Sequence, residues 1–214
     1  MILLFARAPV LDPNGSMERL LLPSRIIDSD HAEVLRLAGN LRGDCRDRVE
    51  IARRCFEWVR DEVQHSHDFQ RNPVTCAASE VLEHRTGYCY AKAHLLAALL
   101  RANGIPAGLC YQRLLRDGDS GRHVLHGLNA IHLPGHGWYR VDARGNRADI
   151  DAQFTPPTAR LAFQATASGE VDHPQILADP LDVVVQVLQG SQTWDEAWQN
   201  LPDIDPEAWP SVVA

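Results

Sequence analysis

The stretch that decides the fold is Glu83–Pro106, EHRTGYCYAKAHLLAALLRANGIP. Nearly every residue of Ala91–Ala102 is alanine or leucine, on all sides of the expected helix, so protein has to surround that helix. Asn103-Gly104 is a typical helix end. Cys89 stands just before the apolar run. The sequence therefore predicts a buried central helix with a thiol at its N-terminal end.

Helices precede this element and strands follow it. Apolar residues at spacings of three and four predict helices, and apolar runs between polar turns predict strands. The helices are expected at 31–43, 44–65 and 75–86, with Asp30 and Thr75 as N-caps, and the strands at 107–115, 123–133 and 138–145. Strands joined by short turns pair as an antiparallel meander. The predicted fold class is α+β, with the buried helix packed against an antiparallel sheet.

The chain of 214 residues, 45% of them hydrophobic, is long enough for one sizeable core. We therefore expect a single domain over 1–214. Its core spans about 45–155, an N-terminal arm and helix cover 1–44, and a C-terminal extension covers 156–214. The extension contains an expected helix near 182–188 and a tryptophan-rich segment, both interpreted as packing onto the sheet.

Charge and composition argue against some classes of binding partner. The net charge of −7 and the absence of a lysine or arginine run argue against nucleic acid or a membrane surface as a partner. The chain has no apolar run of about 18 residues and its start lacks a positive region before an apolar run, so a cytoplasmic location is expected. The five cysteines are odd in number and lack CxxC spacing, which favours reduced thiols.

A cysteine attacks a carbonyl as the thiolate, and the free N–H groups and dipole at a helix N-terminus favour that form. Cys89 has this position, with Thr86 as the expected cap and Gly87 leaving room for close approach. The competing interpretation is that Cys89 is a small apolar residue of the core, since free cysteines are among the most buried residues. A nucleophilic role therefore depends on partner residues elsewhere in the chain.

A histidine and a carboxylate follow at suitable places. A thiolate needs a base that takes its proton and an acid that protonates the leaving amine, and a histidine supported by a carboxylate performs both tasks. His126 and Asp142 lie on two strands that are expected to be neighbours. The remaining cysteines have no such pair after them and are interpreted as packing residues: Cys45, Cys55, Cys76 and Cys110.

Three phrases in this order, TGYCYAKAHLLAALLRANGIPAGL, HGLNAIHL and GWYRVDARGN, resemble the transglutaminase-like superfamily. The resemblance covers roughly residues 45–155 and implies a papain-like core with a Cys-His-Asp triad. Carried over, it implies Cys89 as nucleophile, His126 as general base and acid, and Asp142 as the group that orients the imidazole. The chain departs from the family pattern after the histidine, where Leu128 and Ala130 replace an aromatic residue and a carboxylate.

The register of two strands decides whether His126 and Asp142 meet. A two-residue turn at Gly135-His136 places them on opposite faces of the sheet. A turn of odd length or a β-bulge shifts the pairing by one residue and brings both to one face. We therefore predict such an irregularity between Leu133 and Trp138 or within residues 126–132.

Further residues are candidates for oxyanion and substrate binding. The backbone N–H of Cys89 is expected to contribute to the oxyanion hole, because the donors must be fixed near the attacking sulfur. The other candidates lie near the triad in sequence or at the end of the preceding helix: Gln64, His65, Asn129 and Arg144.

A metal site is the other chemistry that ten histidines could indicate. The closest pairs, His65 with His67 and His123 with His126, have no HExxH motif or cysteine pair beside them. Asp149 and Asp151 lack the spacing of a calcium loop. We therefore expect no metal and no cofactor.

The combined prediction is thiol-dependent acyl transfer from an amide, with a peptide, a protein or a small amide as substrate. With water as acceptor the enzyme is a cysteine peptidase or amidase, and with a lysine amine it is a transglutaminase; the residues leave both open. The alternative is a non-catalytic module that keeps the fold and holds a peptide or a protein in the cleft.

Overall fold

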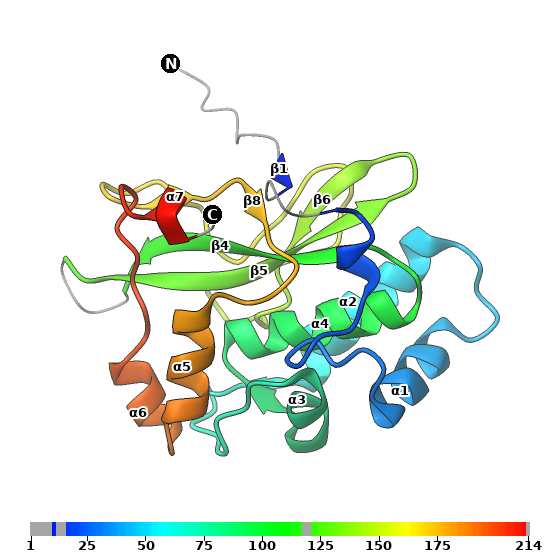
Figure 1. The fold of residues 1–214 in the computed structure, drawn as a ribbon, viewed down its shortest axis with the longest axis horizontal. Helices are drawn as coiled ribbons and strands as arrows, with labels where there is room; N and C mark the ends of the chain where they lie inside the picture. The colour runs from blue at the N-terminus through cyan, green and yellow to red at the C-terminus, as the bar shows by residue number, and fades with distance from the viewer. Residues whose placement is uncertain (1–9, 12–15, 117–120, 213–214) are drawn as a thin grey trace.

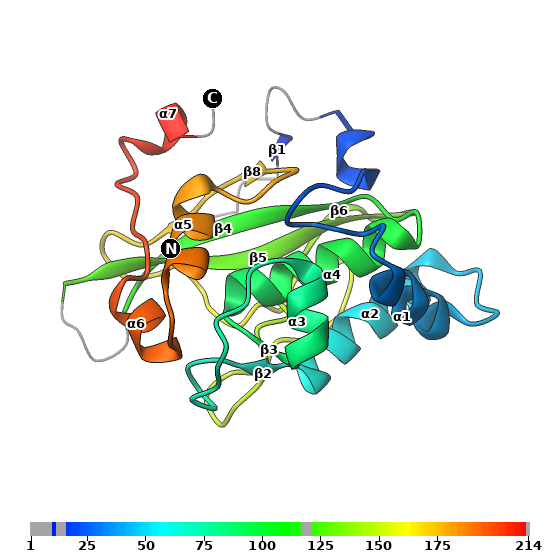
Figure 2. The ribbon, with the colours of Figure 1, turned by 60° about the horizontal axis from the view of Figure 1, so that its bottom comes forward.

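The computed structural model describes residues 10–11, 16–116 and 121–212 as a sheet covered by helices (Figure 1). The sheet has the strand order β6-β5-β4-β7. Its strands are β4 (Ala107–Leu115), β5 (His123–Leu133), β6 (Gly137–Val141) and β7 (Val171–Asp172). The helices α1 to α4 lie on one face, and β8 lies on the other (Figure 2). The α+β architecture is the predicted one.

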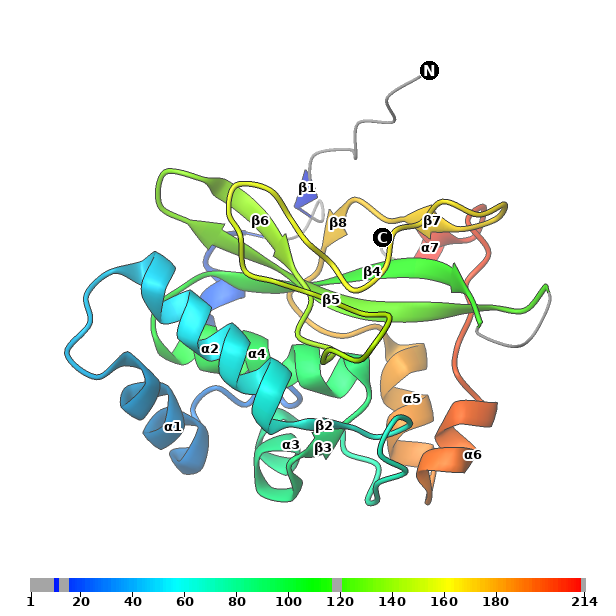
Figure 3. The same ribbon diagram turned by 180° about the vertical axis from the view of Figure 1, so that it is seen from behind.

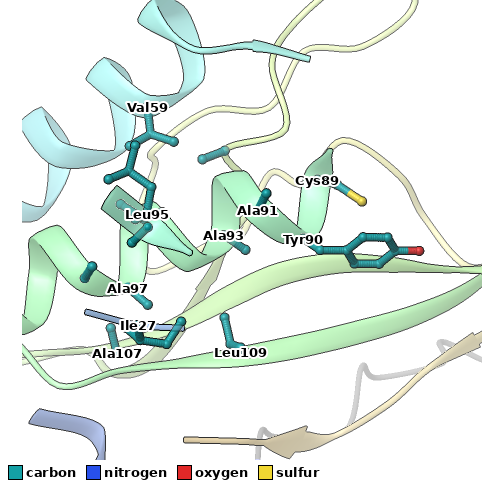
Figure 4. Close-up of a cluster of buried hydrophobic side chains, with 14 of the residues drawn as sticks. Ile27, Val59, Cys89, Tyr90, Ala91, Ala93, Leu95, Ala97, Ala107 and Leu109 are labelled. Carbon is teal, nitrogen blue, oxygen red and sulfur yellow. The ribbon is translucent and has the colours of Figure 1, made fainter. Parts of the chain in front are cut away.

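The central helix α4 (Cys89–Ala102) is buried along its length, as its alanine and leucine pattern predicts. Helices α1 (Ala32–Arg42), α2 (Arg48–Glu62) and α3 (Ala78–His84) surround it on the side away from the sheet. Figure 4 shows side chains of this helix among those of α2 and β4, with Cys89 at its end. The burial of α4 fixes the position of Cys89 relative to the sheet.

Polar side chains of α4 bind backbone carbonyls. Lys92 donates to the carbonyls of Arg60 and Val63 at the end of α2. His94 Nδ1 lies 2.8 Å from the carbonyl of Cys76. These bonds satisfy the Lys92 ammonium and one ring nitrogen of His94, whereas His94 Nε2 is buried without a partner among the described residues.

The predicted caps of α1 and α3 are wrong. Helix α1 is capped by His31, whose side chain accepts the N–H of Glu33, and not by Asp30. Thr75 donates to the carbonyl of Thr86 instead of capping α3. The carboxylate of Glu80 accepts the N–H groups that precede α3. A cap residue is chosen by the path of the preceding loop, which residue type alone does not determine.

A short parallel pair links the end of α2 to the start of α4. Strand β2 (Gln64–His65) pairs with β3 (Thr86–Gly87), so His65 lies opposite Gly87. Ser66 N–H extends the pair by donating to the carbonyl of Gly87 at 3.1 Å. This pair brings the end of α2 next to the thiol of Cys89.

The turn between β5 and β6 contains three residues, Pro134–His136, because Leu133 pairs with Gly137. Asn129 consequently pairs with Val141. Continuing this register places Asp142 level with Leu128, which shares a face with His126 because side chains alternate along a strand. The predicted odd-length turn is confirmed.

The C-terminal extension adds strands and helices around the sheet, visible from behind in Figure 3. Strand β8 (Gln175–Ile176) pairs with β1 (Val10–Leu11), and β7 pairs with β4. The remaining elements are η1 (Arg19–Leu21), α5 (Asp182–Gly190), α6 (Trp194–Gln199) and α7 (Trp209–Val212). Residues 1–9 and 12–15 of the predicted N-terminal arm lie outside the described part. Within that part, no helix has the length and apolar character to cross a membrane.

Candidate active site

A cleft with a cavity volume of about 200 Å³ opens at the N-terminal end of α4. Its walls come from β2 and the loop after it, the first turn of α4, the ends of β4 and β5, the loop after β6 and the C-terminal extension. Cys89 and His126 both line it. The two residues that sequence analysis paired as nucleophile and base therefore share one cavity.

Cys89 begins α4, and no side chain caps this helix end. The predicted cap, Thr86, instead donates its hydroxyl to the carbonyl of Gln64. The first-turn N–H groups thus lack a side-chain acceptor, which leaves the positive end of the helix dipole directed at the thiol. The Cys89 side chain is buried but reaches the cleft.

The edge of β5 beside Cys89 is free of its neighbouring strand. Pairing with β6 ends at Asn129 and Val141, so the N–H of Gly127 has no strand partner. This N–H donates to Cys89 Sγ at 3.5 Å. The departure of β6 thereby gives the sulfur a backbone donor.

His126 and Asp142 are in direct contact, with Nε2 of the imidazole 2.7 Å from Oδ2 of the carboxylate. Asp142 is fully buried and also accepts the backbone N–H groups of Arg144 at 3.1 Å and Ala162 at 3.2 Å. Burial alone raises the pKa of the Asp142 carboxyl, but His126 and these two amides together hold it below its usual value. The buried carboxylate therefore stays charged and orients the imidazole.

The thiol and the imidazole shift each other toward the charged forms. Burial raises the pKa of the Cys89 thiol, but the imidazoles of His126 and His65 outweigh it and lower the pKa to about 6. Burial lowers the pKa of His126, but Asp142 and Cys89 outweigh it and raise the pKa. At neutral pH this arrangement favours a thiolate and imidazolium pair.

The other buried thiols have the opposite environment. Burial raises the pKa of Cys55 and Cys76 to about 12 and that of Cys110 to about 11. Their interpretation as packing residues agrees with these environments. Cys89 differs because two imidazoles face it.

His65 approaches the thiol from β2, on a different side from His126. It lines the cleft, packs edge-on against Tyr88 with ring centres 5.6 Å apart, and has Nδ1 3.5 Å from Asp68 Oδ1. Asp68 is held by both terminal nitrogens of Arg144, at 2.6 and 2.9 Å. Arg144 also lines the cleft, so this candidate residue reaches the cavity while its guanidinium is bound to Asp68.

Two candidate residues, Gln64 and Asn129, do not line the cleft. Gln64 precedes His65 on β2, and neighbouring residues of a strand point to opposite faces. Asn129 is fully buried and donates to the carbonyls of Ala93 and Gly108, tying α4 to the sheet. It lies three residues from His126 and hence on the other face.

Residues that sequence analysis missed complete the walls. Phe163 packs edge-on against His126, with ring centres 5.0 Å apart, and Trp198 and Arg116 line another part of the cleft. Leu128 and Ala130, where the family pattern has other residues, are buried in a second apolar cluster on the far face of the sheet. The aromatic surface near the histidine thus comes from Phe163, in a loop that carries no periodic signal.

Comparisons with known proteins agree with this core. Residues 35–143 match the family model described as Transglutaminase-like superfamily. The chain is similar in structure to a candidate cysteine protease from Cytophaga hutchinsonii, with 24% sequence identity over 62% of this chain and 43% of that chain, and a TM-score of 0.50. It also matches the periplasmic domain of TgpA from Pseudomonas aeruginosa, with 24% identity over 58% of this chain and 45% of that one, and a TM-score of 0.45.

The chain therefore spans less than half the length of either of these two structures. No curated protein matches the sequence. At this level of identity, the likeness to the first structure is a likeness of fold.

Proposed function

Because the chain belongs to the transglutaminase-like superfamily, we propose that it cleaves an amide bond through a covalent intermediate on Cys89. His126 is the general base and acid in this proposal, and Asp142 orients it. The observation that carries the proposal is the 2.7 Å contact between His126 and the buried Asp142, next to a cleft that both Cys89 and His126 line.

The proposed reaction has two stages. The Cys89 thiolate attacks the carbonyl carbon, the carbonyl oxygen becomes an oxyanion, and the imidazolium of His126 protonates the nitrogen that leaves as ammonia or an amine. The product is a thioester. In the second stage His126 takes a proton from water, the hydroxide attacks the thioester, and the thiolate is regenerated with a free carboxylic acid.

Water is the acceptor that we propose, and a lysine amine is the competing acceptor. The two give different products from one carboxamide substrate. Hydrolysis releases ammonia and a carboxylic acid, whereas transfer releases ammonia and joins the acyl group to the amine. Incubation of a glutamine-containing peptide with and without a labelled primary amine separates them, and incorporation of the label would replace water by an amine in this proposal.

The oxyanion needs at least one donor besides the N–H of Cys89, and we propose His65 for this role. The residue is 6% exposed, lines the cleft and lies on the side of the thiol supplied by β2. An imidazole that donates a hydrogen bond to the developing oxyanion stabilises the transition state more than the substrate.

The His65→Phe variant is expected to lower kcat for amide cleavage by about 10²–10³-fold, the usual effect of removing one oxyanion donor. Phenylalanine keeps a ring beside Tyr88. Alkylation of Cys89 by iodoacetamide forms no oxyanion, so at a pH where Cys89 is ionised in both proteins its rate should change much less than kcat. Equal losses in both measurements would show that His65 acts only on the thiol.

Cys89 should be the most readily alkylated cysteine in the folded protein at slightly acidic pH. Its pKa is lowered to about 6, so the rate of iodoacetamide modification should be half-maximal near that pH and fall as the thiolate is protonated below it. Mass spectrometry of modified peptides across pH gives the rate at each site, with the partly buried Cys45 as reference. If Cys89 reacts no faster than Cys45 or Cys110, the proposed nucleophile is wrong.

The non-catalytic binding module remains the competing function. Screening of amide and peptide substrates with wild type and Cys89→Ala separates it from an enzyme. Cleavage by wild type that is lost in Cys89→Ala supports the enzyme, whereas substrate binding without cleavage by either protein supports the module.

A further inference from the structure

The edge of β5 next to the thiol, which β6 does not cover, is covered by a C-terminal segment of the same chain. Extended peptides commonly bind by adding a strand to such an edge. Here the N–H of Leu125 donates to the carbonyl of Pro202 at 2.7 Å, and its carbonyl accepts the hydroxyl of Tyr90. An extended peptide therefore finds no unpaired backbone group at Leu125, two residues from the Gly127 N–H that faces Cys89.

The occupying segment, Trp198–Asp203, is anchored at both ends. Nε and Nη2 of Arg113 each lie 2.7 Å from one oxygen of Asp203. Nη2 of Arg122 donates to the carbonyl of Gln199 at 2.7 Å. Trp198 and Leu201 of this segment line the cleft. The anchored segment thus forms the wall of the cleft along the β5 edge and closes the cleft at that end.

Arg116 lies against this wall, with its guanidinium carbon 4.4 Å from the ring centre of Trp198. It lines the cleft, and no carboxylate of the described residues forms an ion pair with it. Arg144, the arginine on the other side, is bound to Asp68. A guanidinium stacked on an indole keeps the N–H groups at its edge available for an anion.

Among the described residues that line the cleft, the carboxylate is Glu170, and its hydrogen-bond partners are backbone amides, not Arg116. Glu170 accepts the backbone N–H groups of Leu115, Thr166 and Ala167, each at 2.9 Å. These three bonds occupy both of its oxygens and hold it in the loop. The cleft therefore combines a thiolate site, a closed end and an arginine that has no carboxylate partner among the residues that the structure describes.

We propose that the cleft takes a short amide that carries a carboxylate, with Arg116 binding that carboxylate and the segment Trp198–Asp203 limiting the length of the substrate. This inference rests on the proposed function, because it assumes that the amide is presented to Cys89. The carboxylate can come from a chain terminus or from an acidic side chain. Two probes, one with each kind of carboxylate, distinguish these sources.

The test uses probes that react with the thiol without turnover. N-iodoacetylglycine carries a carboxylate, and N-iodoacetylglycinamide is its neutral counterpart; in both, the thiolate displaces iodide and forms a thioether. Wild type should react with the charged probe about tenfold faster, and Arg116→Gln should lose this preference. Arg46→Gln, which makes the same change of charge at an exposed position away from the cleft, should keep it. Equal preferences in wild type and Arg116→Gln would overturn the proposal.

The source of the carboxylate is resolved by N-iodoacetyl-aspartic acid amide, whose carboxylate is in the side chain. A faster reaction than with N-iodoacetylglycine assigns an acidic side chain, and a slower one assigns a chain terminus. Length is tested with N-iodoacetyl-pentaglycine, which wild type should modify at least tenfold more slowly than the single-residue probe. Asp203→Ala, which removes the ion pair with Arg113, should reduce the difference in rate between the long and the short probe. Equal rates for the two probes in wild type would contradict a closed end.

A binding measurement makes the result independent of the thiol. Titration of N-acetylglycine and N-acetylglycinamide into Cys89→Ala by calorimetry should show tighter binding of the charged compound, lost in Cys89→Ala with Arg116→Gln. If Cys89 is reactive but neither assay shows the preference, the inference fails and the proposed function stands. If calorimetry shows the preference for the charged compound while Cys89 of wild type is unreactive, the proposed function fails and the binding site stands.

Discussion

The Asp142→Asn variant is expected to lose about 10⁴-fold in kcat for amide cleavage, the effect seen when the carboxylate of a comparable triad is neutralised. An asparagine amide fits the same space but offers no negative charge to the imidazolium. The pKa of His126 then falls, because the carboxylate raises it in wild type. A less stable imidazolium lowers the pKa of Cys89 less effectively.

The pH dependence of alkylation reports this change directly. In wild type the thiolate of Cys89 forms as the pH rises through about 6. In Asp142→Asn the midpoint should move up by about 1–3 pH units, toward that of an ordinary thiol. The matched control is Asp151→Asn, since Asp151 is exposed and pairs with Arg160 on the surface. An unchanged midpoint in Asp142→Asn would contradict the coupling of Asp142, His126 and Cys89.

The Gly127→Ala variant is expected to lower kcat by about 10²-fold or more, because it separates the start of α4 from β5. A Cβ atom at Gly127 would lie 2.8 Å from Cδ1 of Tyr90, 3.1 Å from its Cα and 3.4 Å from its backbone N. The ring can turn, but the backbone of the first helical turn has to move. Cys89, the preceding residue, then moves away from His126.

The loss of activity should exceed the loss of stability. Overpacking at one site costs about 1–3 kcal/mol of unfolding free energy, measured by urea denaturation. Gly39→Ala in α1 is the control, since nothing lies within 4 Å of a Cβ there and alanine favours the helix. If Gly127→Ala keeps wild-type kcat, close contact between β5 and the α4 N-terminus is not required for catalysis.

The sequence was most informative where a pattern extends over many residues. The burial of α4 follows from alanine and leucine on all sides, and β4 and β5 begin and end where the apolar runs do. The need for an odd-length turn followed from the alternation of side chains along a strand. The positions of His126 and Asp142, together with the requirement that they meet, were sufficient to predict it.

Short-range signals were less reliable, because several residue types compete for one position. Thr86 was a suitable helix cap, yet its hydroxyl is used by the carbonyl of Gln64 in the β2–β3 pair. Which of Gln64 and His65 faces the thiol depends on a strand of two residues, too short to show alternation in the sequence. Phe163 and Arg116 reach the cleft from a loop and a strand end, where no periodicity marks a direction.

The cleft walls come from two separate parts of the chain. The region that matches the family model ends at residue 143, whereas Phe163, Trp198 and Leu201 all come from the C-terminal extension. The proposed nucleophile and its partners thus belong to a different part of the chain from much of the surface that a substrate would meet. Exchange of the extension is therefore expected to change selectivity while it leaves the proposed reactive centre unaltered.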